Sequence, residues 1–469
     1  MTPPEPPHSE TKKHGFSPTA IEDLRARVRG RVLLPTDAGY AEECAGFNTT
    51  VVHHPDVVVA IESAEDAVAC VRFARTVQTK IHVQGAGHGG EAPIRSGLLV
   101  STRALKRVQI DPLRGVAKIQ AGARWGSVIA AAAEHGLAPI TGSSPTVGVV
   151  GYLMGGGLGP LARSHGFSSD YVLGVNVVTG AEQCLESTLD LNPDVLWAFR
   201  GGKGGCGIVT ELELRLVPLR TLYAGSLYYD APHLEAAFRA WVSWTASAPD
   251  SVTTSVAIAR FPAVDALPPP LRGRTLLVLR FAYPGSAEEG ARLAQPLRTA
   301  APIYLDALGE MPAAEVARIH NDPTEPLAAS LRSAMLTHVD QDLASALLAH
   351  VGAGQSSPFL ATEIRHIGGA TRRDPPEGTA VGGRESSFTL TCICADPQLF
   401  QSAFPAACDR LTTDLTPWLS PHNNINFLAP IRSAEHYASA WPRATYARLA
   451  EIRRRYDPER LFEHGYGDE

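Results

Sequence analysis

Glycine is concentrated in two short stretches of this chain, and this concentration limits what each stretch can form. The first stretch follows an apolar run that ends at Gln84, and it comprises Gly85, Ala86, Gly87, His88, Gly89 and Gly90. The second runs from Gly142 to Gly159 with the sequence GSSPTVGVVGYLMGGGLG. Because glycine has no Cβ atom, backbone N–H groups in such loops can converge on an anion. Two loops of this kind predict one large, phosphate-bearing cofactor that lies across both.

The usual nucleotide-binding motifs do not describe these loops. The first loop has the pattern G-x-G-x-G-G rather than the G-x-G-x-x-G of a Rossmann fold, and no helical pattern begins at Gly90. A Walker A lysine with its Ser or Thr is also absent. From the loops alone, a nucleotide cofactor and a set of tight structural turns both remain open.

Composition indicates a folded, multi-domain protein without a nucleic-acid partner. The 469 residues predict two or three domains. Hydrophobic residues make up 44% of the chain and charged residues 19%, which is enough for a sizeable core. The net charge of −6 comes from interspersed acidic and basic residues, so no basic footprint for nucleic acid exists.

The chain also lacks membrane and secretion signals. It has no run of about 18 apolar residues, so we expect no membrane span. Residues 1–15 are polar and proline-rich, which predicts a disordered tail rather than a signal peptide. The seven cysteines are an odd number without a framework spacing, which predicts buried thiols in a reducing cytosol and hence a cytoplasmic protein. Cys392 and Cys394 lack the further ligands of a metal site.

Hydrophobic periodicity predicts alternating helices and strands in the first half of the chain. Helical patterns with start and stop signals cover 17–30, 63–74, 125–135 and 194–199. Strand patterns cover 98–100, 116–119, 172–179 and 208–217. In the last of these, Leu212, Leu214 and Leu216 alternate with charged residues, which indicates a half-buried strand. Pro218 ends that strand and marks the first predicted domain boundary.

The middle of the chain has a different pattern. Alternating runs cover 251–261, 275–283, 359–366 and 386–395, and a helical pattern covers 286–298. They predict an antiparallel sheet with helices on one face, in a separate α+β domain. The last residues predict a helix at 398–415, a strand at 424–428 and a charged helix at 442–456.

Several motifs together resemble those of one flavoprotein family. They are Gly87-His88-Gly89, the run from Gly142 to Gly159, LWAFRGG at 196–202, GIVT at 207–210, RHIGGA at 365–370, Asn426-Phe427, Arg448-Leu449 and Tyr456-Asp457-Pro458. Residues 33–218 in particular resemble the FAD-binding domain of the berberine bridge enzyme-like flavoproteins, in the vanillyl-alcohol oxidase superfamily. The resemblance implies an α+β fold with a two-part PCMH-type FAD-binding domain. Its first part would be 16–218 and its C-terminal part 416–469, with a substrate domain at 219–415.

The resemblance implies how FAD is held. His88 occupies the position of the histidine that bonds covalently to the flavin 8α-methyl group. A cysteine that forms a second link in many members is replaced by Ser144, so this chain resembles the branch with a histidine link only. The cofactor-binding residues implied are Gln84, Gly85, Ala86, Gly87, Gly89, Gly90, Gly142, Ser143, Ser144, Val147, Gly148, Gly151, Tyr152, Gly155, Ile208, Val209 and Asn426, with the 208–209 pair at the adenine end.

The resemblance also suggests how the flavin is used. Val147 stands at the position beside flavin C4a that influences access of dioxygen, and valine leaves room there. We therefore expect an oxidase that returns electrons to dioxygen and produces hydrogen peroxide. Tyrosines that serve as base in the best-known branch are replaced by Gly90, Leu158 and Asn424.

The proton acceptor is therefore expected in the substrate domain. Glu363 and Arg365 lie two residues apart on a predicted strand, so they share one face of it. A carboxylate there would take a hydroxyl proton while hydride leaves for the flavin. We predict Glu363 as this base and Arg365 as its partner, with Tyr152 and His366 as secondary candidates.

The sequence thus predicts an FAD-linked oxidase that acts on a small alcohol, sugar or secondary metabolite. A flavin-dependent oxygenase or oxidative cyclase would use the same residues and remains an alternative. A ligand-binding protein without redox activity, built on the same fold, is the alternative of another class. Neither the substrate nor the oligomeric state follows from the sequence.

Overall fold

A four-stranded sheet carries the first glycine loop. The computed structural model describes residues 15–90 and 92–462, so nearly all of the predicted tail lies outside the described residues. The sheet has the order β1 (Arg31–Leu33), β2 (Val57–Ala60), β4 (Leu98–Ser101) and β3 (Ile81–Gln84). β4 lies parallel to β2 and β3, whereas β1 is antiparallel to β2. The chain leaves the end of β3 directly into the glycine loop.

Helices α1 (Pro18–Arg27) and α3 (Ala64–Val77) begin where the sequence predicts. Ser17 and Ser63 cap them by accepting hydrogen bonds from backbone N–H groups of the first helical turn. Apolar residues of both helices pack with those of β2 and β4 in one buried cluster. These caps and this apolar face are the features from which the two helices were predicted.

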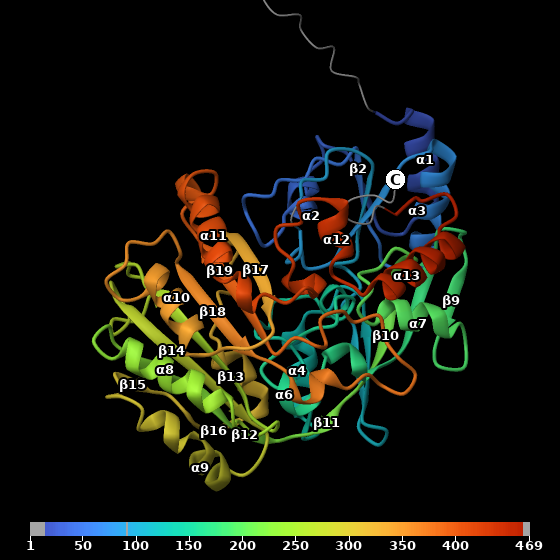
Figure 1. The fold of residues 1–469 in the computed structure, drawn as a ribbon. Coiled ribbons are helices and arrows are strands. Elements are labelled where there is room, and N and C mark those ends of the chain that lie inside the picture. Colours follow the sequence, from blue (N-terminus) through green and yellow to red (C-terminus); the bar gives the residue numbers. More distant parts are fainter. Residues whose placement is uncertain (1–14, 91, 463–469) are drawn as a thin grey trace, which may run out of the picture.

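A second, antiparallel sheet lies beside the first and carries its own helices. Its order is β5 (Val108–Asp111), β6 (Val116–Gln120), β10 (Gly207–Arg215), β8 (Val172–Thr179) and β9 (Cys184–Ser187). Helices α4 (Trp125–Ala133), α7 (Pro193–Phe199) and α13 (Arg443–Tyr456) contribute to its core. The leucines of β10 are buried, as the alternation predicts. Figure 1 shows the C-terminal helices α12 (Ala434–Ala438) and α13 beside this first half of the chain.

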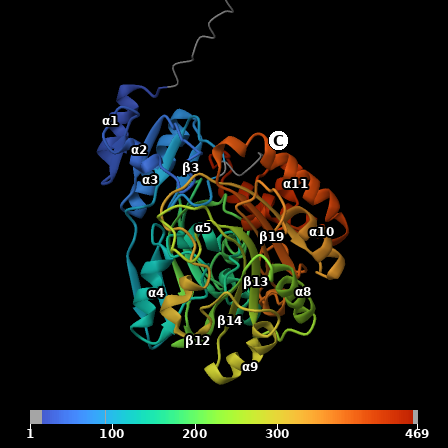
Figure 2. The ribbon, with the colours of Figure 1, turned by 90° about the vertical axis from the view of Figure 1, so that its left-hand side faces the viewer.

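The middle of the chain forms a large antiparallel sheet. Its order is β15 (Leu305–Asp306), β12 (Thr221–Tyr229), β14 (Thr275–Tyr283), β13 (Thr253–Arg260), β18 (Ala361–His366), β19 (Phe388–Cys394) and β17 (Ser330–Leu336), and β16 (Gly309–Pro312) also pairs with β12. Helices α8 (Leu234–Thr245), α9 (Ala287–Arg298), α10 (Gln341–Val351) and α11 (Ala403–Asp414) share one apolar core with the sheet. Figure 2 shows α8, α10 and α11 along one side of this sheet and the short helix α5 (Val149–Leu153) on the other.

Several details after residue 218 differ from the sequence prediction. The expected strand at 424–428 is a 3₁₀ turn, η6 (Ile425–Phe427), because the Asn424 side chain accepts a hydrogen bond from the backbone N–H of Asn426. The helix expected at 398–415 begins only at Ala403, after a separate turn at Pro397–Leu399. Strands β12 and β17 were not predicted.

Most of the cysteines are buried, as the sequence predicts. All seven cysteines are free thiols, and all except Cys184 are buried. Within the described ranges, no helix combines the length and the apolar character needed to cross a bilayer.

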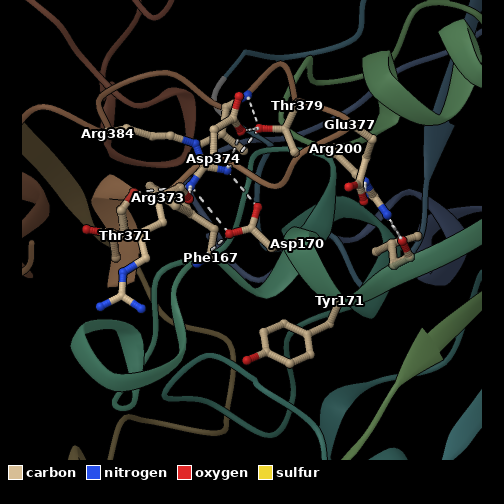
Figure 3. Close-up of polar contacts among 12 residues, drawn as sticks. Phe167, Asp170, Tyr171, Arg200, Thr371, Arg373, Asp374, Glu377, Thr379 and Arg384 are labelled. Atoms are coloured by element: carbon tan, nitrogen blue, oxygen red, sulfur yellow. Dashed lines mark hydrogen bonds and ion pairs between the residues drawn. The ribbon is translucent and has the colours of Figure 1, made fainter. Parts of the chain in front are cut away.

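A buried arginine joins a loop of the middle segment, residues 371–379, to the first half of the chain. Arg384 donates to both carboxylate oxygens of Asp170, at 2.6 and 3.3 Å, and to the carbonyls of Thr371 and Arg373 at 3.1 and 2.8 Å. Figure 3 shows the guanidinium between Asp170 and this loop, with Thr379 as a further acceptor at 2.9 Å. Burial raises the pKa of Asp170, and Arg384 opposes the rise. The Arg384 guanidinium therefore donates hydrogen bonds to acceptors in the loop and to the Asp170 carboxylate at the same time.

We predict that Arg384→Gln destabilises the protein by about 3–5 kcal/mol, because it leaves Asp170 as a buried carboxylate without its cation. Thermal unfolding measures the loss. The double variant Arg384→Gln/Asp170→Asn should recover part of it, since neither charge then remains. Arg292→Gln, which removes an exposed ion pair with Glu289, is the control and should leave the unfolding temperature nearly unchanged. Equal effects of Arg384→Gln and the control would contradict the assignment.

Candidate active site

Side-chain hydrogen bonds from Gln84 and Arg103 hold the first glycine loop in place. The Gln84 amide donates to the carbonyls of Glu43, Cys44 and Ala45, at 3.1, 3.4 and 3.3 Å. Arg103 donates from Nε to the carbonyl of Gly85 at 3.0 Å. All of these hydrogen bonds are accepted by backbone carbonyl groups, so they do not occupy the backbone N–H groups of the loop. Gln84 therefore supports the loop through its side chain.

Both glycine stretches carry unpaired backbone donors. Between described residues, no hydrogen bond is donated by the backbone N–H groups of Gly85, Ala86, Gly87, His88 and Gly89, nor by those of Gly142, Ser143, Ser144 and Thr146. A Cβ atom at Gly89 or Gly151 would meet no atom within 4 Å, so both glycines border open space. Unpaired N–H groups around open space suit an anion. The two stretches therefore fit the pyrophosphate of a dinucleotide such as FAD.

His88 is held in a fixed orientation. Its Nε2 lies 3.0 Å from Oγ1 of Thr146, which in turn lies 3.0 Å from Oγ of Ser144. The Phe47 ring stacks on the imidazole with centroids 4.0 Å apart. Burial, and then the charge of Arg124, lower the pKa of His88 to about 4. The imidazole is therefore neutral near pH 7, and Nε2 is the ring nitrogen that contacts the Thr146 hydroxyl.

The second stretch is packed against one aromatic ring and one amide. A Cβ atom at Gly157 would lie 2.4 Å from the ring of Tyr152, so only glycine fits there, where φ is +79°. Asn426 donates to the carbonyl of Tyr152 at 2.8 Å and accepts from Nζ of Lys203 at 2.9 Å. At Gly155 a Cβ atom would lie 2.0 Å from Oδ1 of Asn426. The C-terminal segment thus fixes the position of this glycine stretch.

The pair at the implied adenine end lies within the second sheet. Ile208 and Val209 are buried residues of β10 and pair with Val178 and Val177 of β8. The side chain of Ile208 packs in the apolar cluster of the first sheet. The pair lies next to Gly207, whose φ is +152°.

Glu363 is the centre of a buried ion-pair cluster. It accepts from Arg365 at 2.8 Å, from Arg280 at 2.8 Å and from Ser255 at 3.0 Å. Glu363 and Arg365 therefore share a face of β18, as their spacing predicts. Burial alone would raise the pKa of Glu363, but Arg365 and Arg280 hold it well below its usual range. Glu363 is consequently an ionised and weakly basic carboxylate.

A histidine that the sequence did not single out lies beside this cluster. His320 follows the turn η2 (Ala313–Ile319), and its Nε2 lies 3.6 Å from Oε1 of Glu363. His320, Arg280 and Arg365 line one pocket together with Leu158 of the second glycine stretch. The next acidic residue, Asp322, accepts from the hydroxyl of Ser143 at 2.6 Å. The pocket therefore lies against the loop proposed to hold the cofactor.

Comparisons with known proteins agree with this geometry. Residues 55–187 match the model of a family described as an FAD binding domain. The sequence is 23% identical to the uncharacterized FAD-linked oxidoreductase YgaK of Bacillus subtilis, over 93% of this chain and 96% of that protein. The crystal structure of 6-hydroxy-D-nicotine oxidase from Arthrobacter nicotinovorans superposes with a TM-score of 0.82 at 22% identity, over 94% of this chain and 98% of that one.

A plant protein gives the same fold. The structure of BBE-like 1 from Physcomitrella patens has a TM-score of 0.80 at 18% identity, over 95% of this chain and 99% of that one. The chain is an FAD-linked oxidoreductase with the fold of the berberine bridge enzyme-like oxidases. The α+β class expected from the sequence is confirmed.

The secondary candidates of this oxidoreductase have other partners. Burial raises the pKa of Tyr152, whose hydroxyl accepts from Ser168 at 3.4 Å, so the phenol stays protonated near neutral pH. His366 lies 2.9 Å from Nη1 of the buried Arg163 and stacks on Phe388. Burial, and then Arg163, lower its pKa to about 2. Both side chains therefore serve packing and hydrogen bonding.

The sequence contained a signal for Arg280 but not for His320. Arg280 is the one charged residue in the run TLLVLRFAY at 275–283, and a lone charge in an apolar strand requires a buried partner. That partner is Glu363, two strands away. His320 lies in an irregular segment without periodicity, so only the three-dimensional structure places it in the pocket.

We predict that Glu363→Gln lowers the free energy of unfolding by about 3–5 kcal/mol, because Arg280 and Arg365 lose their shared counter-charge in a buried site. Thermal unfolding of the purified protein measures the effect. Glu289→Gln, at an exposed pair with Arg292, is the matched control and should leave the unfolding temperature nearly unchanged. A Glu363→Gln variant as stable as the wild type would show that the carboxylate does not hold the two arginines.

Proposed function

We propose that this FAD-linked oxidoreductase binds FAD covalently through His88 and oxidises a small alcohol, sugar or secondary metabolite with dioxygen as electron acceptor. One observation carries the proposal. The stretch from Gly142 to Gly159, with its unpaired N–H groups, contributes Leu158 and Gly159 to the same pocket as Arg365 and His320. Cofactor loop and substrate pocket are therefore adjacent.

Bound FAD would supply the hydride acceptor at its N5 atom. The residues of the chain have the remaining tasks. The N–H groups of the two glycine stretches offset the charge of the pyrophosphate. His88, neutral and held through Nε2 by Thr146, offers Nδ1 to the 8α-methyl group. Ser144 lies in hydrogen-bond contact with Thr146 and forms no thioether, which supports a single covalent link.

The substrate domain supplies the polar groups for the substrate. Gly90, Leu158 and Asn424 carry no basic side chain at the three positions where the resemblance implies tyrosines. Glu363 and Arg365 meet on the pocket side of β18, and Glu363 stays ionised beside its arginines. Arg365 would orient a substrate oxygen, and Glu363 would hold Arg365 in place.

The acceptor is proposed to be dioxygen, and hydrogen peroxide its product. Val147 lies within the second glycine stretch, and its carbonyl accepts from the backbone N–H of Trp125 at 3.0 Å, which fixes the backbone there. The resemblance places this side chain beside flavin C4a. A relative with the same fold is named as an oxidase, which agrees with the proposal.

A substrate panel tests the proposal. Purified protein is mixed without oxygen with glucose, xylobiose, vanillyl alcohol and 6-hydroxynicotine, and the absorbance of the oxidised flavin is followed. Bleaching by an alcohol, and peroxide release once air is admitted, support the oxidase. Oxygen incorporated into the product would identify an oxygenase instead. A yellow protein that none of the compounds bleaches would favour a binding protein.

We predict that FAD is attached through His88 alone. Denatured wild-type protein should remain yellow, because the imidazole is neutral and oriented for the bond. Digestion should give one flavin-bearing peptide that contains His88, as mass spectrometry would show. His88→Ala should release its flavin in acid, whereas Ser144→Ala should retain it.

The pH dependence of attachment is a further check on the imidazole. Because burial lowers the pKa of His88 to about 4, the nucleophile stays neutral well below the usual range of histidine. Apo-protein mixed with FAD should therefore gain acid-stable flavin at the same rate at pH 8 and pH 5.5. An attachment rate that is lower at pH 5.5 than at pH 8 would contradict the assignment. Complete release of the flavin by acid from the wild-type protein would also contradict it.

We predict that Val147→Leu slows reoxidation of the reduced flavin by about tenfold, equivalent to about 1.4 kcal/mol of barrier, because the larger side chain fills the space that dioxygen needs. Stopped-flow mixing with air-saturated buffer measures this step. Reduction by substrate should be unaffected. Val147→Ala is the control and should reoxidise as fast as the wild type. A wild type that reoxidises slowly and prefers a quinone would be a dehydrogenase.

A further inference from the structure

His320 is a buried side chain whose polar atoms have no partner. Its side chain is 6% exposed, and neither ring nitrogen makes a hydrogen bond with the described residues. The ring lines the pocket that also contains Arg280, Arg365 and Leu158. A buried polar group without a partner is costly and uncommon in a folded protein. A ligand with a hydrogen-bonding group in this pocket would supply what is missing.

The charges around His320 come from three elements and balance. Arg280 faces it from β14, Glu363 and Arg365 face it from β18, and Asp322 lies in the segment that follows it. Burial, then Arg365 and Arg280, lower the pKa of His320 to about 3, while Glu363 and Asp322 oppose this change. The imidazole is thus neutral near pH 7 and has a free lone pair.

We propose that His320 is the catalytic residue that accepts the hydroxyl proton of the substrate. This inference rests on the proposed function and deepens it. Nε2 is the ring nitrogen near Glu363, so Glu363 would stabilise the imidazolium that forms, and Nδ1 is the nitrogen left to accept the proton. Glu363 itself is occupied by three donors, which makes the unpartnered imidazole the more available acceptor.

The proposed step balances in atoms and electrons. The O–H bond of the substrate breaks and its proton moves to Nδ1. The electron pair left on oxygen forms the carbonyl double bond, and the hydride leaves the same carbon for the flavin. A weakly basic imidazole suffices, because a carbonyl that still carries its proton is a far stronger acid than the imidazolium of His320. The proton therefore passes to His320 as the hydride departs.

The same cluster selects the class of substrate. Of the four charged groups around His320, only the two arginines line the pocket itself, so the nearest charge disfavours a protonated amine. Leu158, Phe281 and Ile367 contribute apolar surface to the wall. The pocket therefore suits a neutral hydroxyl on an apolar or sugar scaffold rather than an ammonium group.

Two conservative variants test the role of His320. His320→Asn keeps a polar atom near the position of Nδ1, and His320→Gln keeps one near Nε2, but neither accepts a proton. With the panel alcohol that bleaches the wild type fastest, anaerobic flavin reduction should fall by about 10²–10⁴-fold in both, at unchanged flavin content. His165→Gln, which alters a half-buried histidine outside the pocket, is the control and should reduce at the wild-type rate.

Rescue separates a proton acceptor from a packing residue. His320→Ala leaves a space for free imidazole, which should restore part of the lost rate in proportion to its concentration. A loss of less than tenfold in His320→Asn and His320→Gln, or a larger loss that imidazole does not restore, would overturn the inference. A wild-type flavin that no panel compound reduces would overturn the proposed function itself, and the inference with it.

A measurement that does not depend on turnover completes the test. In protein labelled with ¹⁵N-histidine, the His320 signals are assigned by their absence from the His320→Asn spectrum. They should show a neutral ring from pH 8 to pH 5, because the facing arginines disfavour protonation. An imidazolium signal at pH 7 would overturn the inference, since a protonated ring has no lone pair to offer.

Discussion

Unpaired backbone donors are the constraint on which this structure depends. Most residues of the two loops are half-buried or exposed, so their N–H groups are open to water and to an anion that would replace it. The fold supports these loops from behind. Gln84 and Arg103 bond carbonyl groups at the first loop, and Asn426 bonds the second. The N–H groups remain free for an anion because the supporting side chains engage other atoms.

Buried arginines join the two halves of the chain around this site. Arg163, in the first half of the chain, donates hydrogen bonds to the carbonyls of Val252 and Ile367, at 2.8 Å each. Arg384, in the middle segment, donates a hydrogen bond to the carboxylate of Asp170 in the first half. Arginine is suited to this task because its planar group serves several acceptors at once. The large sheet of the middle segment is thereby fixed against the first half of the chain, and the pocket forms between parts of the chain that are distant in sequence.

Local patterns predicted what local physics decides. Ser17 and Ser63 cap their helices because a hydroxyl satisfies free N–H groups, and the leucines of β10 are buried because alternation gives a strand one apolar face. The strand predicted at 424–428 is wrong. Its apolar residues resemble a strand pattern, but the Asn424 side chain caps a 3₁₀ turn there. The pairing of Glu363 with Arg365 followed from spacing within one strand. Arg280 and His320 join them through sheet order and an irregular turn, which no local pattern encodes.

One segment connects the substrate pocket to the histidine loop. His320 lines the pocket, Asp322 bonds Ser143, and Leu327 exchanges backbone hydrogen bonds with Phe47 and Thr49. Phe47 in turn stacks on His88.

The turn within this segment uses Asn321 at a φ of +51°, a left-handed conformation that asparagine tolerates better than most residues. Asp322 and Leu327 tie its two ends to different loops of the first half, so the segment has little freedom to shift alone. The proposed sites of cofactor attachment and of substrate recognition are thus joined by the same few contacts.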